Sequence, residues 1–413
     1  MRRSAAMVVL LSGLFAIPAS PQSNESSVTG EYTVVPNWPK PWARQGYIWG
    51  SHASVFAESQ NRVYLAVRGE LKLPANIPAN FPGFWGFFGE RALSVPNPEA
   101  RNCIVVVDAN GNVIESWTQW DHLWAENVKK PGTPLGPHSI KISPYDPQRH
   151  VWIVDESGQQ VLEFSHDGKE LVMALGEKGV IGNDQKHFGQ PQDIAWLPDG
   201  SFLVADGLTN SRIVKFDKNG KYLMAWGNKG SDRGEFNGAH AVATDRNRHV
   251  YVADRGNHRI QVFDENGKFL AQWPNIMFPN SILITAGQEA WVADGIDGYT
   301  PSAVTTHTRL LKYSLGGRLL AWWGAYGSEP GTFWEDHSIS SDPEGNFYVA
   351  DSCTGRTQKF RPKPGADRSR LVGAPQPLMS AQDTAAPLAR QIALPRRSVV
   401  RVPTEVETAA GTH

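Results

Sequence analysis

The chain repeats a unit of four short strands, and this repeat limits the folds open to it. One copy reads Phe188-Gly-Gln-Pro-Gln-Asp-Ile-Ala-Trp, then Phe202-Leu-Val-Ala-Asp, then Ser211-Arg-Ile-Val-Lys-Phe, then Lys221-Tyr-Leu-Met-Ala-Trp-Gly. Apolar residues alternate along each segment, and Asp-Gly, Asn-Gly or Gly-Asn turns separate the segments. A four-stranded unit of roughly 40 residues is typical of propeller blades. We therefore predict an all-β propeller.

The copies number six and occupy residues 31–361. They begin near Tyr47, His138, Phe188, Phe236, Phe278 and Phe333. The sixth copy lacks an outer strand, and the stretch from Glu31 to Trp38 is suited to supply it. We expect this N-terminal strand to close the ring, because closure leaves only short sheet edges.

Three segments fall outside the repeat. Residues 1–23 combine Arg2-Arg3, an apolar run and a small-residue end, a pattern that predicts an export signal. We therefore expect a secreted or periplasmic protein with no transmembrane segment after signal removal. Residues 71–98, rich in proline and aromatic residues, form an insertion in the first blade that either shapes a binding site or packs as a surface loop. Residues 362–413 lack periodicity, which predicts a disordered tail.

Composition excludes one class of partner. The chain has 40 basic and 41 acidic residues, whereas nucleic-acid-binding proteins normally carry a basic excess. Cys103 and Cys353 lie in the first and last copies, which a ring makes neighbours. They form either a disulfide or two buried thiols. Nothing in the sequence determines the oligomeric state.

Three histidines occupy one register of alternate copies. His138, His240 and His337 each open the first strand of a copy. In a closed ring of six, these side chains converge on the axis. Three imidazoles with a fourth position open are the ligand set of a catalytic zinc site. We therefore predict a zinc centre on the propeller axis.

Other polar residues surround this predicted centre. Gln192 and Asn280 stand at the same register in the intervening copies, which suggests contact with substrate. His52 is one residue out of phase, and we expect it either to support a ligand residue from behind or to be structural. Arg68 and Arg255 follow the second strands of the first and fourth copies. Either is placed to hold a substrate carboxylate, and position alone does not choose between them.

The repeats resemble NHL repeats in their Val-Ala-Asp strand, Asn-x-Arg-Ile turn and closing Trp-Gly. From about residue 45 to 360 the chain also resembles the peptidyl-α-hydroxyglycine α-amidating lyase family. The stretch from Asn183 to Ala195, the stretch from Asp206 to Val214, and Gly136-Pro-His-Ser-Ile carry this resemblance.

The resemblance implies a six-bladed propeller with zinc on His138, His240 and His337. It also implies that Arg68, followed by Gly69, is the catalytic arginine that binds the substrate carboxylate. The implied reaction cleaves the N–Cα bond of a C-terminal α-hydroxyglycine, giving a peptide amide and glyoxylate.

The chain departs from the family pattern at the expected base. The family's catalytic tyrosine corresponds to Leu208, which cannot accept a proton, and Tyr47 and Tyr299 are the substitutes considered. The family's structural calcium is held by an aspartate that corresponds to Ser338, so calcium near Ile140 is a weaker expectation. A family disulfide corresponds to Gly189 and Thr209 and is lost as a pair.

Three functions follow from these residues. The first is an exported zinc lyase of the amidating type, acting on a peptide or another small molecule. The second is a non-catalytic propeller that binds a peptide or other ligand at its mouth. The third is a propeller lactonase or hydrolase, although such enzymes usually hold calcium with carboxylates, and the axis here offers histidine, glutamine and asparagine.

Overall fold

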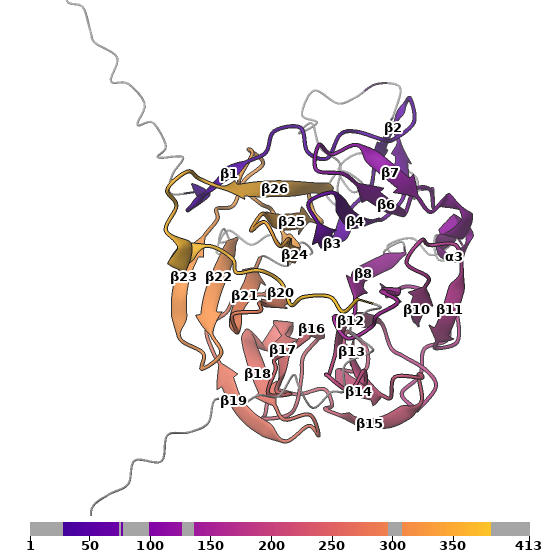
Figure 1. Cartoon of the computed structure of the whole chain (residues 1–413). Helices are drawn as coiled ribbons and strands as arrows, with labels where there is room; N and C mark the ends of the chain where they lie inside the picture. The colour runs from indigo at the N-terminus through magenta and orange to yellow at the C-terminus, as the bar shows by residue number, and fades with distance from the viewer. Residues whose placement is uncertain (1–27, 74–75, 77–98, 126–135, 296–307, 381–413) are drawn as a thin grey trace, which may run out of the picture.

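The computed structural model describes residues 28–73, 76, 99–125, 136–295 and 308–380. Within these residues, six four-stranded antiparallel sheets stand around a common axis, and a small two-stranded sheet lies beside them (Figure 1). The prediction of an all-β, six-bladed propeller is confirmed.

Each blade is a meander whose first strand lies next to the axis. Blades one and two contain β3 (His52–Ser59), β4 (Arg62–Val67), β6 (Ile104–Val107) and β7 (Val113–Ser116), then β8 (Pro137–Ile142), β9 (Val151–Asp155), β10 (Gln160–Phe164) and β11 (Leu171–Leu175). Blades three and four contain β12 (Pro191–Trp196), β13 (Phe202–Asp206), β14 (Arg212–Phe216) and β15 (Tyr222–Trp226), then β16 (Ala239–Thr244), β17 (Val250–Asp254), β18 (Arg259–Phe263) and β19 (Phe269–Trp273). Blades five and six contain β20 (Pro279–Ile284), β21 (Glu289–Asp294), β22 (Arg309–Ser314) and β23 (Leu319–Trp323), then β24 (Asp336–Ser341), β25 (Phe347–Asp351) and β26 (Arg356–Pro362).

The N-terminal strand closes the ring, as the sequence predicts. β1 (Tyr32–Val34) pairs antiparallel with β26, with Tyr32 opposite Pro362 and Val34 opposite Phe360. The sixth blade therefore contains strands from both ends of the propeller, and β26 has a partner on each side.

A buried aspartate at the end of the second strand fixes the geometry of most blades. Asp206 accepts hydrogen bonds from the Gly189 amide (2.6 Å) and from Arg212 Nε (2.8 Å). Asp254 makes the equivalent bonds with the Asn237 amide and Arg259 Nε, both at 2.7 Å. Because each aspartate ties the loop before its blade to the third strand, the repeated aspartates are structural.

The apolar core lies between neighbouring blades. Trp152 of blade two packs on Phe202 of blade three with ring centroids 4.9 Å apart, and Trp273 of blade four stacks on Tyr313 of blade five at 5.3 Å. Aromatic side chains bury large apolar areas and account for much of the packing energy of such interfaces. The axis itself is left available for polar groups.

The folded part extends past the predicted boundary at residue 361. Residues 363–380 continue from β26 through η4 (Arg368–Arg370), and Val372 is only 5% exposed. Lys312 Nζ donates to the Ser369 carbonyl (2.7 Å), and the Val372 amide donates to the Tyr32 hydroxyl (2.6 Å). These bonds join isolated backbone groups rather than a ladder, so they leave no periodic pattern in the sequence.

The remaining predicted segments lie largely outside the described residues. These are the export signal at 1–23, the insertion from residue 77 to 98 and the tail from residue 381. The described start of the insertion belongs to β5 (Glu70–Lys72), which pairs antiparallel with β2 (Tyr47–Trp49) in a two-stranded sheet. Among the described helices, none has the length and apolar character needed to span a bilayer.

Candidate metal centre and channel mouth

A bulge in each innermost strand aims one residue at the axis. In all six inner strands the register with the second strand shifts by one residue near the start. Such a bulge leaves a residue outside the ladder and changes the direction of its side chain. The bulge residues all line the channel; they are Ala53, His138, Gln192, His240, Asn280 and His337.

This register confirms that His52 lies one residue away from the axis position. The bulge residue of blade one is Ala53, whereas His52 pairs with Val67 and is fully buried. Its Nδ1 lies 2.8 Å from Thr357 Oγ1, and burial lowers its pKa to about 3. His52 is therefore a neutral packing residue next to Trp42 and Trp49.

The three predicted histidines converge on one point. The ring centroids of His138, His240 and His337 are 4.7 to 5.0 Å apart in the three pairs. One ring nitrogen from each lies within 4.8 Å of the others. All three residues are at least nine-tenths buried. Convergence of three imidazole nitrogens at this spacing is what a single metal ion requires.

A matching hydrogen bond orients each imidazole. His138 Nδ1 lies 2.7 Å from the Gln192 carbonyl, and His240 Nδ1 lies 2.7 Å from the Asn280 carbonyl. His337 Nδ1 lies 2.7 Å from the Ala53 carbonyl. Because a carbonyl only accepts, each Nδ1 carries the proton and each Nε2 presents a lone pair. Backbone carbonyls that hold ligating histidines in this way are typical of metal sites.

The three imidazoles are neutral. Burial lowers the pKa of His138, His240 and His337 well below the usual value, and the charges of Arg68 and Arg255 add to the effect. Metal binding requires the deprotonated ring. The donor set of three neutral nitrogens, with a mouth open to one side, therefore fits a zinc ion with one free coordination position.

Two arginines line the mouth above the triad. Arg68 and Arg255 border the same pocket as the three histidines. Arg68 is 9% exposed; its Nη2 donates to Glu156 Oε2 at 3.2 Å, and its Nε has no hydrogen-bond partner. Within the described residues, no carboxylate forms an ion pair with Arg255. The mouth therefore contains Arg68, which Glu156 holds in place, and Arg255, whose guanidinium is available to bind an anion.

The mouth also contains two carboxylates that the sequence analysis did not select. Glu156 and Glu335 border the pocket together with Leu208. Glu335 Oε2 accepts from Ser352 Oγ and from Cys353 Sγ. Glu156 follows the second strand of blade two, the place that Arg68 and Arg255 hold in their blades, so comparison of this register would have found it.

The other predicted polar residues also reach the channel. Gln192 and Asn280 line it between the histidines. Gln192 Oε1 and both amide atoms of Asn280 are buried without hydrogen-bond partners, so they retain capacity to bind a ligand. Tyr47 does not reach the mouth, because its hydroxyl bonds Glu99 Oε1 at 3.0 Å. Tyr299 lies outside the described residues.

The surroundings of Ile140 offer few ligands for calcium. The Ile140 amide donates to Ser54 Oγ (3.2 Å), which in turn lies 3.1 Å from Ser338 Oγ. The nearby carboxylate of Asp193 is bonded to Lys141 Nζ at 2.7 Å. Calcium requires six or more oxygen ligands, usually with several carboxylates. The hydroxyl pair and the bound ammonium supply few such ligands, and calcium at backbone oxygens near Ile140 stays a prediction from the sequence.

The two cysteines do not form a disulfide. Cys103 and Cys353 are free and buried, and burial raises the pKa of both thiols well above the usual value. Of the two alternatives left open by the sequence, the structure has the pair of buried thiols.

Comparison with known proteins agrees with this geometry. The NHL repeat family model matches residues 236–263. Peptidyl-glycine alpha-amidating monooxygenase B of Xenopus laevis is 30% identical over 243 residues, which is 56% of this chain and 27% of that protein. A probable peptidyl-alpha-hydroxyglycine alpha-amidating lyase of Caenorhabditis elegans is 39% identical over 125 residues, 29% of this chain and 35% of that protein.

NHL repeat-containing protein 3 of Homo sapiens is 29% identical over 179 residues, 41% of this chain and 46% of that protein. The chain spans less than half the length of each of these three relatives. The fold and the site define a six-bladed NHL-repeat propeller with a buried triad of histidines. This propeller is related to the peptidyl-α-hydroxyglycine α-amidating lyases.

Proposed function

We propose that the protein is a zinc-dependent carbon–nitrogen lyase that cleaves the N–Cα bond of a C-terminal α-hydroxyglycine. The carrying observation is the triad of buried, neutral imidazoles, with each Nε2 free and two arginines at the mouth. The relatives named as amidating lyases support this reaction class. Zinc on the triad would supply Lewis acidity for the α-hydroxyl of the substrate.

The arginines bind and orient the substrate. A peptidyl-α-hydroxyglycine ends in a carboxylate, and Arg68 Nε together with the guanidinium of Arg255 offers donors to it. Charge-assisted hydrogen bonds of this kind are about twice as strong as neutral ones. Holding the carboxylate at the mouth places the adjacent α-carbon toward the triad.

Glu156 takes the place of the absent tyrosine as proton acceptor. Its Oε2 bonds Arg68, and its Oε1 is the oxygen that remains for the substrate. We assign it the proton of the α-hydroxyl. As the C–O bond becomes the carbonyl of glyoxylate, the N–Cα electron pair moves to nitrogen, and Glu156 returns the proton there. The atoms balance: one carbinolamide gives one peptide amide and one glyoxylate.

Release of glyoxylate from a peptidyl-α-hydroxyglycine tests this function. Zinc-loaded protein should release glyoxylate, and Glu156→Gln should lower kcat about 10²- to 10⁴-fold, the usual contribution of general acid–base catalysis. Glu344→Gln, which changes an exposed carboxylate far from the pocket, is the control. If Glu335→Gln lowered kcat and Glu156→Gln did not, Glu335 would be the proton acceptor instead. Glyoxylate release no faster than in the absence of protein would reject the lyase.

Leu208 supports a second function. An apolar side chain at the mouth, where the related lyases are expected to hold a tyrosine, favours a propeller that binds a peptide or other carboxylate-bearing ligand without cleaving it. Binding of an α-hydroxyglycine peptide that depends on Arg68 and Arg255, without glyoxylate release, would establish this alternative. Export to a secreted or periplasmic location stays a prediction from residues 1–23.

A further inference from the structure

The channel has a second chamber at the end opposite the histidines. It measures about 550 Å³ and is bordered by the downstream halves of all six inner strands. Because these strands run in the same direction around the ring, the residues near their starts form one mouth and those near their ends form the other. The lining is mostly apolar, as Val55, Ile142, Val242 and Ile284 illustrate.

A strap from the C-terminal extension roofs this chamber. Residues 374–378 border it, and hydrogen bonds fasten the strap on two sides of the ring. The Ala286 amide of blade five donates to the Ala374 carbonyl (2.9 Å), and the Met379 amide donates to the Pro144 carbonyl of blade two (3.1 Å). The strap crosses the opening, and the space of about 550 Å³ beneath it has the size of a small-molecule site.

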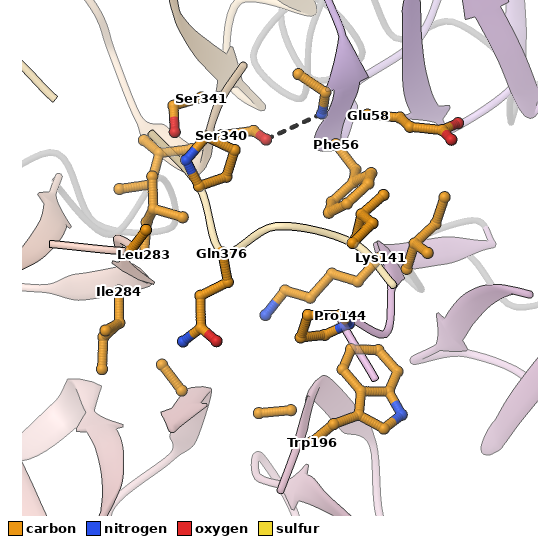
Figure 2. A pocket seen from close by; sticks show the side chains of 18 of the residues that line it. Phe56, Glu58, Lys141, Pro144, Trp196, Leu283, Ile284, Ser340, Ser341 and Gln376 are labelled. Atoms are coloured by element: carbon orange, nitrogen blue, oxygen red, sulfur yellow. Dashed lines mark hydrogen bonds between the residues drawn. The ribbon is translucent and has the colours of Figure 1, made fainter. Parts of the chain in front are cut away.

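A few polar groups project into the chamber (Figure 2). Lys141 Nζ donates to the Asp193 carboxylate (2.7 Å) and to the Ile194 carbonyl (3.2 Å). An ammonium has three donors, so one remains. Gln376 Oε1 accepts from the Tyr145 hydroxyl (3.3 Å), and its Nε2 donates to no described residue. The carboxylate of Glu58 also borders the chamber, but its oxygens already bond Arg149 Nη1 and His166 Nε2, both at 2.9 Å. The unused groups of Lys141 and Gln376 are donors.

From these features we propose that the chamber binds a small, largely apolar molecule with one hydrogen-bond-accepting end, such as a carboxylate or carbonyl. Ligand sites typically measure roughly 300 to 1,000 Å³ and combine apolar walls with a few placed polar groups. The apolar part lies against the six strands, and the accepting end meets Lys141 and Gln376.

This site is separate from the proposed lyase reaction. A polar layer of the channel, containing Ser139, Asp193 and Ser338, lies between the chamber and the histidines. Asp193 accepts from Ser139 Oγ (2.8 Å) and from the Val242 amide (3.1 Å), which fixes this layer. A protein that releases no glyoxylate can therefore still bind a ligand in the chamber, and a protein that binds no ligand there can still release glyoxylate.

Displacement of a fluorescent probe tests the proposal with the full chain. N-phenyl-1-naphthylamine should bind with a rise in fluorescence, and dodecanoate should displace it. Dodecylamine, whose polar end donates instead of accepts, should displace it at least tenfold more weakly. Equal displacement by the two compounds would overturn the assigned polar end.

Filling the chamber locates the binding. Ala243→Leu on β16 should weaken probe binding at least tenfold, because the added side chain occupies the space. Ala271→Leu, on the exposed outer strand of the same blade, is the matched control. Zinc content and the unfolding midpoint report whether each variant folds, and Ala195→Leu fills the chamber independently from blade three. No probe binding in the wild-type protein, or binding unchanged in both folded filling variants, would overturn the proposal.

Discussion

The two ends of the channel are built by the same six strands, yet they have opposite chemistry. At the upstream end, a bulge turns one residue of each strand toward the axis, and three of these residues are neutral imidazoles beside charged side chains. At the downstream end the strands present Val, Ile and Ala, and a strap covers them. The comparison teaches that strands of only six to eight residues can present a polar site at one end and an apolar one at the other, with a register shift that turns the polar residues toward the axis.

Removing one imidazole should have the largest effect, because it should greatly weaken zinc binding at the upstream end and leave ligand binding at the downstream end unchanged. His240→Ala leaves two nitrogen ligands, and we expect zinc affinity to fall by at least about 100-fold, since even loss of a partner that orients a ligand costs 10- to 100-fold. Elemental analysis after dialysis measures the change. His122→Ala, at an exposed histidine, should keep about one zinc per chain, and the downstream chamber should still bind its probe. Full zinc retention in His240→Ala would refute the metal centre.

Removing the arginines should reduce substrate use without removing zinc. Arg68→Ala and Arg255→Ala should each lower kcat/KM by about 10- to 100-fold, because each loses hydrogen bonds to a charged group. Steady-state glyoxylate release measures this. Arg318→Ala, at an exposed site, controls for loss of positive charge. If both variants match the wild type, the carboxylate is held elsewhere.

Acid should destabilise the metal-free upstream end. Burial lowers the pKa of the three histidines, so the folded protein keeps them neutral while the unfolded chain takes up protons below about pH 6.5. The stability they contribute is present above that pH and is lost as pH falls. Denaturant unfolding of chelator-treated protein from pH 7.5 to 5 should show the decline. His240→Asn should show a shallower decline, and an equal slope would contradict this origin.

The smallest effect is expected at the strap. Gln376→Ala removes one hydrogen-bond donor from the downstream chamber, which corresponds to a change of about 2- to 10-fold in ligand affinity. Displacement of the fluorescent probe by dodecanoate measures it. Glyoxylate release should be unchanged, since the polar layer separates the two ends. A parallel loss of glyoxylate release would show that the two ends are coupled.

The sequence predicts the blades well because their signals are local. Alternating apolar residues and turn pairs identify the strands, and the repeat register places His138, His240 and His337 on one ring. The same register places His52 one residue away from the axis position, and the structure confirms this with Ala53 as the bulge residue. Glu156 was missed because a glutamate after a strand resembles any solvated residue until the fold brings it to Arg68. The strap was missed because its bonds are to scattered backbone groups.

The pairing of β1 with β26 has a consequence for the order of events during synthesis. The third imidazole, His337, belongs to the blade that is made last, and that blade lacks its outer partner until residues 356–362 have emerged and met the N-terminal strand. Until residues 356–362 have emerged, a growing chain therefore holds at most two of the three histidines in a finished blade. Binding of metal by all three imidazoles therefore follows the pairing of the two ends of the propeller.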